Sequence, residues 1–330
     1  MRRAVKSRTD GRHIGFGKVI LFGEHFVVYG AEAIVAGISE YTTCDLSLLK
    51  GRPGVVEVVD RRPAVPGYID EKREEQRVAH ALVLRHLNID TTSDGLRVTL
   101  GGPLIPSSGI GASASDVVAL SRALNELYAL GLSEACINRS AYAGECGYHG
   151  TPSGADNTAA TYGGLISFRR VGKESVFERL TLRKPLSLVV CSTGITASTT
   201  KVVADVARLK TSDPKWFDEL FRRYNACVQE AQLVLQRGDL RRLGQLMDIN
   251  HEICQKLTVS CEELDAIVMC CRACGALGAK MSGTGRGGLV VALAENNGER
   301  DRIAEAVKKQ CTSAKFVWKY SVQSAGGGKL

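Results

Sequence analysis

The hydrophobic and polar positions of this 330-residue chain follow two periods, which predict a mixture of strands and helices. Apolar or alternating runs flanked by turn residues predict strands at 18–21, 26–29, 43–60 (as a hairpin turning at 51–54), 96–100, 161–168, 186–192 and 315–323. Amphipathic spacing predicts helices at 70–87, 116–130, 133–147, 198–209, 214–236, 239–256, 261–276 and 298–310. A charged stretch at 169–184 is the expected boundary, which divides the chain into parts 1–184 and 185–330.

Composition narrows the class of protein. Hydrophobic residues make up 44% and charged residues 24% of the chain, as in ordinary soluble globular proteins. The formal net charge of +8 fits either a mildly basic surface or a site for anions. The positive residues are scattered and lack interleaved aromatic residues, so we expect no nucleic-acid binding. No apolar run reaches the length of a membrane span, so we expect no membrane insertion.

The cysteines and the last residues bear on the compartment. Eleven cysteines, an odd number, do not form the pattern of a secreted disulfide framework. Cys270, Cys271 and Cys274 lie in a predicted helix without a second metal-binding pair, so we interpret them as core thiols in a reducing compartment. We expect a cytoplasmic protein. The ending Gly328-Lys329-Leu330 differs at one position from the peroxisomal signal Ser-Lys-Leu, which leaves a peroxisome-like organelle as an alternative.

The segment PSSGIGASAS (106–115) is the first of four segments that could carry chemistry. Gly109 and Gly111 would let backbone N–H groups approach an anion, and the helix predicted to follow would add its positive end. The segment lacks the Gly-Lys-Ser/Thr of a Walker A loop. A simple structural turn is the alternative explanation.

Each of the other three segments, taken alone, also has a purely structural explanation. Lys18 precedes a Gly-Glu-His turn, HGTPSGADN (149–157) carries Asp156 after the helix that holds Glu145, and MSGTGRGG (281–288) separates two apolar runs. A surface lysine, a helix cap and a hairpin turn would explain them one by one. Together they supply the parts that phosphoryl transfer needs, namely a backbone cradle, oxygen ligands for Mg²⁺, a carboxylate near the acceptor and a cation.

In this order, GKVILFGEHFVVYG, PSSGIGASAS, HGTPSGADN and KMSGTGRGG resemble the motifs of the galactokinase, homoserine kinase, mevalonate kinase and phosphomevalonate kinase (GHMP kinase) superfamily. Within it, the VVYG that follows Gly-Glu-His and the Pro-Ser-Gly-Ala-Asp-Asn loop most resemble the mevalonate kinases. The resemblance implies an α+β fold with two lobes, an N-terminal one like ribosomal protein S5 domain 2 and a ferredoxin-like C-terminal one. It implies transfer of the γ-phosphoryl group of ATP to the C5 hydroxyl of mevalonate, with Mg²⁺. The alternatives are phosphomevalonate kinase, another alcohol kinase of the superfamily, or a catalytically silent ligand sensor.

The resemblance also implies roles for individual residues. It makes Asp156 the catalytic base, or the group that orients the C5 hydroxyl, and it makes Lys18 the cation that stabilises the transferring charge. It makes Ser113 and Glu145 the Mg²⁺ ligands. The residues expected at the ATP phosphates are Ser107, Ser108, Gly109, Ile110, Gly111, Ala112, Ser113, Gly283 and Gly285. Those expected at mevalonate are Glu24, His25, Thr193, Thr196, Ser198 and Thr199. Family members are often homodimers inhibited by isoprenoid diphosphates that compete with ATP, so both properties are expectations here.

The chain departs from the family pattern at three positions. Phe16 stands where the family usually has Pro, which should alter only the entry of the strand. Ala112 replaces one Ser of the usual Gly-Ser-Ser, so the role of Ser113 depends on which hydroxyl binds the metal. Arg286 replaces a Gly of the last loop, where we expect it to face solvent rather than to contact a phosphate.

Overall fold

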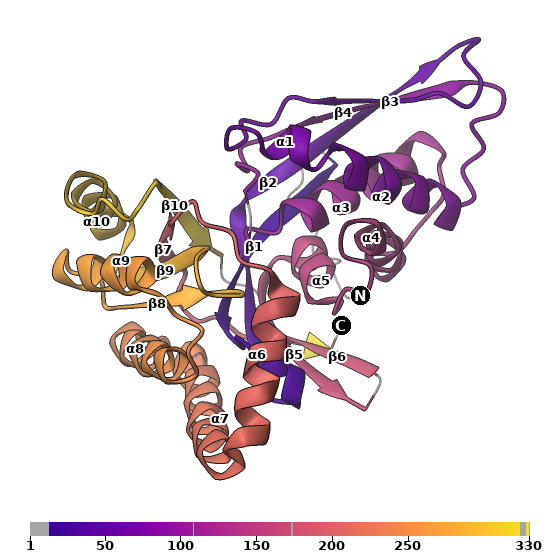
Figure 1. Cartoon of the computed structure of the whole chain (residues 1–330). Coiled ribbons are helices and arrows are strands. Elements are labelled where there is room, and N and C mark those ends of the chain that lie inside the picture. The colour runs from indigo at the N-terminus through magenta and orange to yellow at the C-terminus, as the bar shows by residue number, and fades with distance from the viewer. Residues whose placement is uncertain (1–12, 108, 173, 324–327, 330) are drawn as a thin grey trace, which may run out of the picture. The chain divides into compact units, whose positions relative to one another are not determined.

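The computed structural model describes residues 13–107, 109–172, 174–323 and 328–329, and these form two compact units (Figure 1). Within the described residues, the first unit holds 13–17, 40–107 and 111–161, and the second unit holds 18–39, 109–110, 162–172, 174–323 and 328–329. Each unit therefore gathers segments that lie far apart in the sequence.

The strands of the first unit are built around β4 (Gly95–Gly101). The second half of β2 (Ala33–Leu49) pairs antiparallel with β4 from Thr43 to Leu49, and β3 (Val56–Asp60) pairs parallel with β4. The prediction of a hairpin at 43–60 was therefore wrong. The turn at 51–54 exists, but β4 lies between β2 and β3 in the sheet and forms hydrogen bonds with both. The strands β2 and β3 therefore do not pair with each other.

The helices of the first unit are α1 (Tyr68–Glu71), α2 (Arg73–His86), α3 (Ala112–Leu127), α4 (Glu134–His149) and α5 (Ala155–Tyr162). Helix α3 is the core helix, because its apolar residues from Ala112 to Leu124 are all buried. Gly144 lets α4 pack closely. A Cβ added there would lie 2.7 Å from Val117 of α3 and 2.7 Å from Val83 of α2. The predicted helices of this unit are confirmed, although α3 begins four residues earlier than expected.

The second unit contains a four-stranded antiparallel sheet in the order β10-β7-β9-β8. Its strands are β7 (Leu186–Ser192), β8 (Gly278–Ser282), β9 (Leu289–Ala294) and β10 (Phe316–Val322). Every residue of β7, β8 and β9 is buried. This unit also holds β5 (Gly164–Val171), which pairs with the first half of β2 and with β6 (Glu174–Leu180), and β6 pairs with β11 (Gly328–Lys329).

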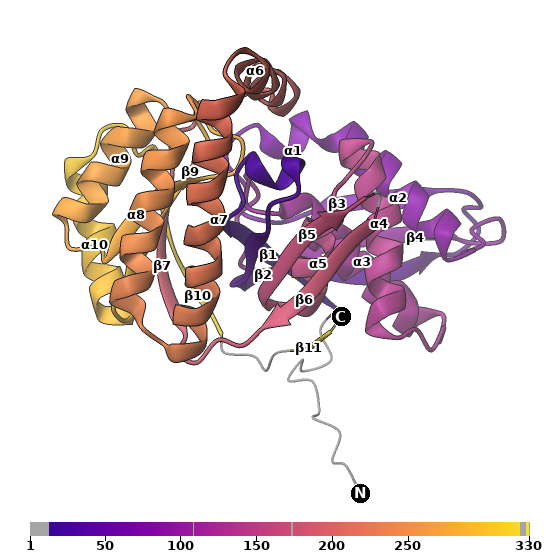
Figure 2. The same ribbon diagram turned by 90° about the horizontal axis from the view of Figure 1, so that it is seen from below.

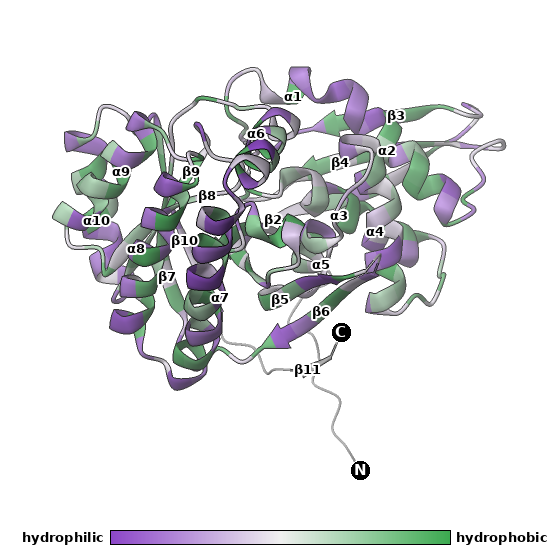
Figure 3. Ribbon diagram, turned by 60° about the horizontal axis from the view of Figure 1, so that its bottom comes forward, coloured by the Kyte–Doolittle hydropathy of each residue, from purple (hydrophilic) through white to green (hydrophobic). Residues whose placement is uncertain are grey.

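The helices of the second unit are α6 (Thr199–Ser212), α7 (Pro214–Arg237), α8 (Leu240–Lys256), α9 (Glu262–Ala273) and α10 (Asn297–Gln310). Helices α8, α9 and α10 pack on the four-stranded sheet (Figure 2). Hydrophilic and hydrophobic residues alternate around α7 and α8, as expected for helices with one buried face (Figure 3). Both helices were predicted within a residue or two of their observed ends.

Two other segments differ from their predictions. Phe26–Tyr29 forms a 3₁₀ helix, η1, rather than a strand, because His25 before it adopts a left-handed conformation with φ 58°. Segment 174–180 forms β6, although its charged residues suggested a boundary. The buried or half-buried thiols of Cys270, Cys271 and Cys274 are free, as the core interpretation predicted. No helix in the described part of the chain is long and apolar enough to cross a membrane.

Candidate active site

The start of α3 in the first unit has the features of an anion site. Gly111, the residue before the helix, has φ 76°, and no side chain caps the helix. The backbone N–H groups of the first turn, which begins at Ala112 and Ser113, are therefore available to a ligand. The hydroxyl of Ser107 is buried without a hydrogen bond to any described residue. Ser108, which was also predicted to contact phosphate, lies outside the described residues.

Lys18 contacts Gly109 and Ile110, the two described residues of the glycine loop that belong to the second unit. Its backbone N–H donates to the carbonyl of Ile110 at 2.8 Å, and its Nζ donates to the carbonyl of Gly109 at 3.3 Å. The residue is 6% exposed. Gly109 has φ 87°, and a Cβ added to it would lie 3.0 Å from the Leu289 side chain. The structure thus places the Lys18 ammonium group against the loop, and its role at the transferring phosphoryl group stays a prediction.

Asp156 lies in the first turn of α5 in the first unit, rather than in a loop before a strand. The helix begins early because the Ser153 hydroxyl accepts from Ala155 N–H at 3.2 Å and Thr158 Oγ1 donates to the carbonyl of Gly154 at 2.6 Å. A carboxylate in the first helical turn is stabilised by the positive end of the helix. Since Asp156 and Lys18 belong to different units, their joint action remains a proposal.

Ser113 and Glu145, the predicted metal ligands, meet at one imidazole in the first unit. The Ser113 Oγ lies 3.3 Å from Nε2 of His149, and Glu145 Oε2 lies 4.0 Å from the same nitrogen. Glu145 is 1% exposed. Both oxygens thus approach the same imidazole nitrogen, and hydroxyl and carboxylate oxygens are the kind of ligand that Mg²⁺ prefers. The sequence analysis missed His149, although its spacing of four residues from Glu145 in a helix was a signal.

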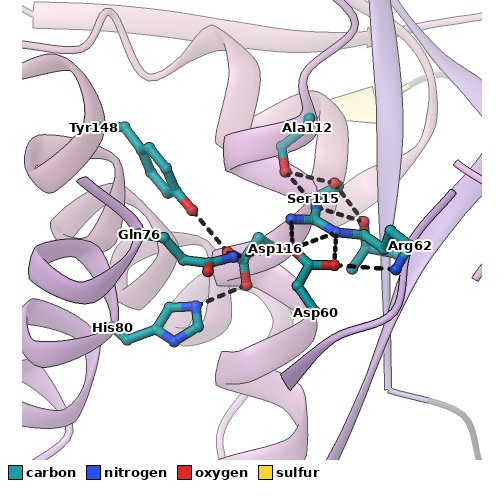
Figure 4. Close-up of polar contacts among 9 residues, drawn as sticks. Asp60, Arg62, Gln76, His80, Ala112, Ser115, Asp116 and Tyr148 are labelled. Atoms are coloured by element: carbon teal, nitrogen blue, oxygen red, sulfur yellow. Dashed lines mark hydrogen bonds and ion pairs between the residues drawn. The ribbon is translucent and has the colours of Figure 1, made fainter. Parts of the chain in front are cut away.

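A buried polar network lies beside the start of α3 (Figure 4). Asp116 is fully buried and accepts hydrogen bonds from His80 Nε2 at 2.8 Å, Gln76 Nε2 at 3.0 Å and Tyr148 OH at 2.8 Å. Burial alone would raise the pKa of Asp116, but His80, Arg62 and the hydrogen bonds lower it to about 2. Asp116 is therefore an ionised carboxylate inside the unit.

Arg62 links this network to the first residue of α3. Its Nη2 lies 2.6 Å from Asp60, and its Nη1 donates to the carbonyl of Ala112 at 3.2 Å. Gln76 joins the two carboxylates, since its amide also lies 3.3 Å from Asp60. Burial opposes the charge of Arg62, but Asp60 and Asp116 raise its pKa above the ordinary value. The network therefore holds α3 at the end where an anion would bind.

These residues also form the wall of a pocket in the first unit. Its lining residues are Asp60, Arg62, Tyr68, Ile69, Lys72, Gln76, Ala112, Ser113 and Tyr148. Burial raises the pKa of Tyr68 to about 12, so the lining presents a neutral phenol. The sequence analysis predicted only Ala112 and Ser113 of this set. A charged Asp116 at the start of an otherwise apolar helix was the available signal for the rest.

The Gly-Glu-His turn of the second unit presents two buried acceptors. Glu24 Oε1 pairs with Lys280, whereas Glu24 Oε2 is buried and has no hydrogen-bond partner among the described residues. His25 Nε2 must donate to the carbonyl of Thr284, 2.6 Å away, because a carbonyl only accepts. Burial lowers the pKa of His25, so its ring is neutral and the buried Nδ1, also without a partner, is an acceptor. Both atoms suit a hydroxyl donor.

The segment 193–199 in the second unit uses much of its hydroxyl capacity internally. Thr193 Oγ1 donates to the carbonyl of Gly288 at 3.3 Å, and Ser198 caps α6 by accepting from Lys201 N–H at 3.4 Å. Thr199 Oγ1 lies 2.7 Å from Thr284 Oγ1 in the last glycine loop. Thr196 is exposed. Thr199 thus approaches the residue that holds His25, whereas Thr193 and Ser198 have structural partners.

The last glycine loop is fixed by its backbone and by Arg286. Gly285 has φ 83°, and a Cβ there would lie 2.0 Å from the carbonyl of Val259, whereas Gly283 has φ 91° and open space around it. We expected Arg286 to face solvent, and this expectation was wrong. Its guanidinium forms an ion pair with Asp205 of α6 and donates to the carbonyl of Thr258 at 3.2 Å. The positive charge of Arg286 is therefore paired within the second unit, because the loop directs the side chain toward α6.

Comparisons with known proteins agree with this geometry. Residues 76–164 match the model of the GHMP kinases N terminal domain, and residues 231–313 match that of the GHMP kinases C terminal domain. The chain is 33% identical over 313 residues to the mevalonate kinase of Pyrococcus furiosus, which covers 88% of this chain and 90% of that protein. It is 32% identical over 322 residues to the mevalonate kinase of Aeropyrum pernix, with 95% of each chain covered.

A solved structure is more similar still. The crystal structure of L. major mevalonate kinase in complex with R-mevalonate is 59% identical in sequence and has a TM-score of 0.94, covering 99% of this chain and 100% of that one. The likeness extends over both units. The predicted α+β fold of GHMP kinase type is thereby confirmed.

Proposed function

Because the chain belongs to the mevalonate kinase family of the GHMP kinases, and is therefore an ATP-dependent kinase, we propose that it phosphorylates the C5 hydroxyl of (R)-mevalonate. The product is 5-phosphomevalonate, an intermediate of isoprenoid and sterol biosynthesis. The observation that carries the proposal is the 59% identity, over 99% of the chain, to a mevalonate kinase whose structure holds R-mevalonate.

The substrate side of the proposal rests on the Gly-Glu-His turn. Mevalonate carries hydroxyl groups, and a hydroxyl is the donor that the buried Glu24 Oε2 and His25 Nδ1 need. Thr199, close to Thr284, is the member of the 193–199 segment that we favour as a further contact. Thr193, Thr196 and Ser198 stay in the proposal as secondary contacts.

The chemistry is a direct in-line transfer without a phosphoenzyme. Asp156 accepts or orients the proton of the C5 hydroxyl as that oxygen attacks the γ-phosphorus. The bond from the γ-phosphorus to the bridging oxygen of ADP breaks as the new bond forms. Lys18, whose Nζ is held at the carbonyl of Gly109, stabilises the charge of the transferring group.

The nucleotide phosphates would lie at the uncapped start of α3, where Ser107 and the backbone after Gly111 offer donors. Gly283 and Gly285 are proposed to support the phosphates from the last glycine loop. Ser113 and Glu145 would hold Mg²⁺, because the family resemblance gives them this role and oxygen atoms are the ligands that this ion prefers. In the structure, these oxygens lie 3.3 and 4.0 Å from the same His149 nitrogen. When bound, that ion would neutralise phosphate charge.

The test is ADP release by the purified chain with MgATP and a panel of mevalonate, phosphomevalonate, homoserine and galactose. Turnover with mevalonate alone supports the proposal. Turnover with another member of the panel would replace the substrate but keep the reaction type. Absence of turnover with all four, in a folded protein that binds ATP, would favour a catalytically silent sensor.

Four further properties are proposed. On the family resemblance we propose a homodimer and competition between isoprenoid diphosphates and ATP. On the sequence pattern we propose a division into lobes 1–184 and 185–330, and a cytoplasmic location with a peroxisome-like organelle as the alternative. Sedimentation at several concentrations tests the dimer. Inhibition by farnesyl diphosphate at increasing ATP tests the competition, since a competitive inhibitor loses effect as ATP rises.

A further inference from the structure

Glu24 and Lys280 form a fully buried ion pair in the second unit. The exposed fraction of both side chains is 0%. Lys280 lies in β8, in which every residue is buried, between the apolar residues Ala279 and Met281. Burying two charges is costly, and an apolar pair of similar volume would often stabilise a fold as well or better. The pair therefore calls for an explanation other than stability.

Lys280 is the cation that pairs with Glu24, and the other titratable groups named below are uncharged near neutral pH. The titratable groups around the pair come from its own turn and from two helices: His25, then Tyr224 and Cys227 on α7, and His251 and Cys254 on α8. Burial raises the pKa of the tyrosine and of both cysteines, and it lowers the pKa of both histidines. These groups are therefore uncharged near neutral pH.

Lys280 fixes one half of the Glu24 carboxylate and leaves the other half open. Its Nζ donates to Glu24 Oε1 and to the carbonyl of Met281 at 2.6 Å. Glu24 Oε2 is buried and accepts no hydrogen bond from the described residues. A buried carboxyl oxygen without a donor is expected to receive one from a ligand.

We infer that Lys280 is a positioning residue, which holds Oε1 of the Glu24 carboxylate and thereby orients Oε2 to accept a hydrogen bond from a hydroxyl of the alcohol substrate. Lys280 touches neither substrate nor nucleotide in this account. It also cancels the charge of Glu24, so that a substrate with its own carboxylate, as mevalonate has, is not repelled. The inference rests on the proposed function for the identity of the alcohol.

Three variants separate this role from a purely structural one. Lys280→Met removes the cation and keeps an unbranched side chain. Glu24→Gln removes the anion and keeps the shape, and the double variant removes both charges. For each, the KM for mevalonate, the KM for ATP, kcat and the urea midpoint would be measured.

We expect Lys280→Met to raise the KM for mevalonate about 10- to 100-fold, the effect of losing a hydrogen bond to a charged acceptor, with the KM for ATP within about twofold. Glu24→Gln should show a similar loss in mevalonate binding. The double variant should regain the urea midpoint of the wild type but keep the loss in mevalonate binding.

Several results would overturn the inference. One is an unchanged KM for mevalonate in Lys280→Met, and another is an equal rise in both KM values, which would indicate general damage. If Lys280→Met does not fold, the double variant decides, since normal mevalonate binding in it would contradict the role. Failure of the proposed function can be told apart from failure of this inference, because the wild type would then not phosphorylate mevalonate. In that case the same KM measurements would be made with the alcohol of the panel that the wild type accepts.

Discussion

Replacing Asp116 by Asn tests whether one ionised carboxylate carries the network at the start of α3. The side chain is fully buried, and its pKa of about 2 lies below the unfolded value of ~3.9. A folded pKa that is depressed adds stability above the unfolded pKa, and this stability is lost as pH falls through the folded pKa. The difference corresponds to roughly 2–3 kcal/mol at pH 7, of which about half remains at pH 3.

The assay is urea unfolding of the wild type and of Asp116→Asn at steps from about pH 7 to pH 3, a range that spans the unfolded pKa. Far-ultraviolet circular dichroism is the suitable probe, because both tryptophans, Trp216 and Trp318, lie in the second unit. The Asn variant has no charge to lose, so its difference from the wild type should shrink as pH falls. Asp45→Asn is the matched control in the same unit, since Asp45 is exposed and should change little.

A difference below about 0.5 kcal/mol at pH 7, the range of surface substitutions, would refute the reasoning. A larger difference that stays constant with pH would also refute it. In that case the variant would act through the clash of its amide with Gln76 and Tyr148, both of which donate to Asp116, rather than through the charge.

Three other predictions follow from the site. Gly285→Ala should lower the melting temperature much more than Gly283→Ala, because only the first places a Cβ 2.0 Å from a carbonyl oxygen, and the second should cost about 1 kcal/mol of strain. Tyr224→Phe should destabilise by about 1 kcal/mol, measured by tryptophan fluorescence in urea, because it removes a 2.6 Å hydrogen bond to the carbonyl of Glu32. Glu145→Gln should raise the Mg²⁺ concentration for half-maximal activity about tenfold or more, while saturating Mg²⁺ restores much of the turnover.

Patterns local in the sequence predicted the helices and the glycine loops. The long amphipathic helices at 214–237 and 240–256 were predicted because one face of each is apolar over several turns. The glycine loop before α3 and a helix after it could be predicted, since glycine and a helix start are sequence features, and its use as an anion site stays a prediction. These successes share a cause, which is that the determining residues lie within one turn or one loop of each other.

The failures share a cause as well. The hairpin expected at 43–60 did not form because β4, some forty residues later, takes the hydrogen bonds of both β2 and β3. The 3₁₀ helix at 26–29 has a strand-like apolar sequence, but it follows a left-handed His25, and Phe26 stacks on Tyr224 at 4.9 Å. Such partners are distant in sequence, so a local pattern does not contain them.

The buried charges show the same limit. The net charge of +8 fitted either a mildly basic surface or a site for anions, and it gave no sign that Arg62 and Lys280 are enclosed and paired with Asp60 and Glu24. Their charges are cancelled inside the unit to which each belongs, so they add little to the attraction of a free anion. Instead, each cation orients a neighbouring group. Arg62 orients the carbonyl of Ala112, and Lys280 orients the carboxylate of Glu24. Affinity for phosphate should therefore depend on the uncapped start of α3 and on Lys18, whereas loss of either buried cation should act through the carboxylate that it leaves behind.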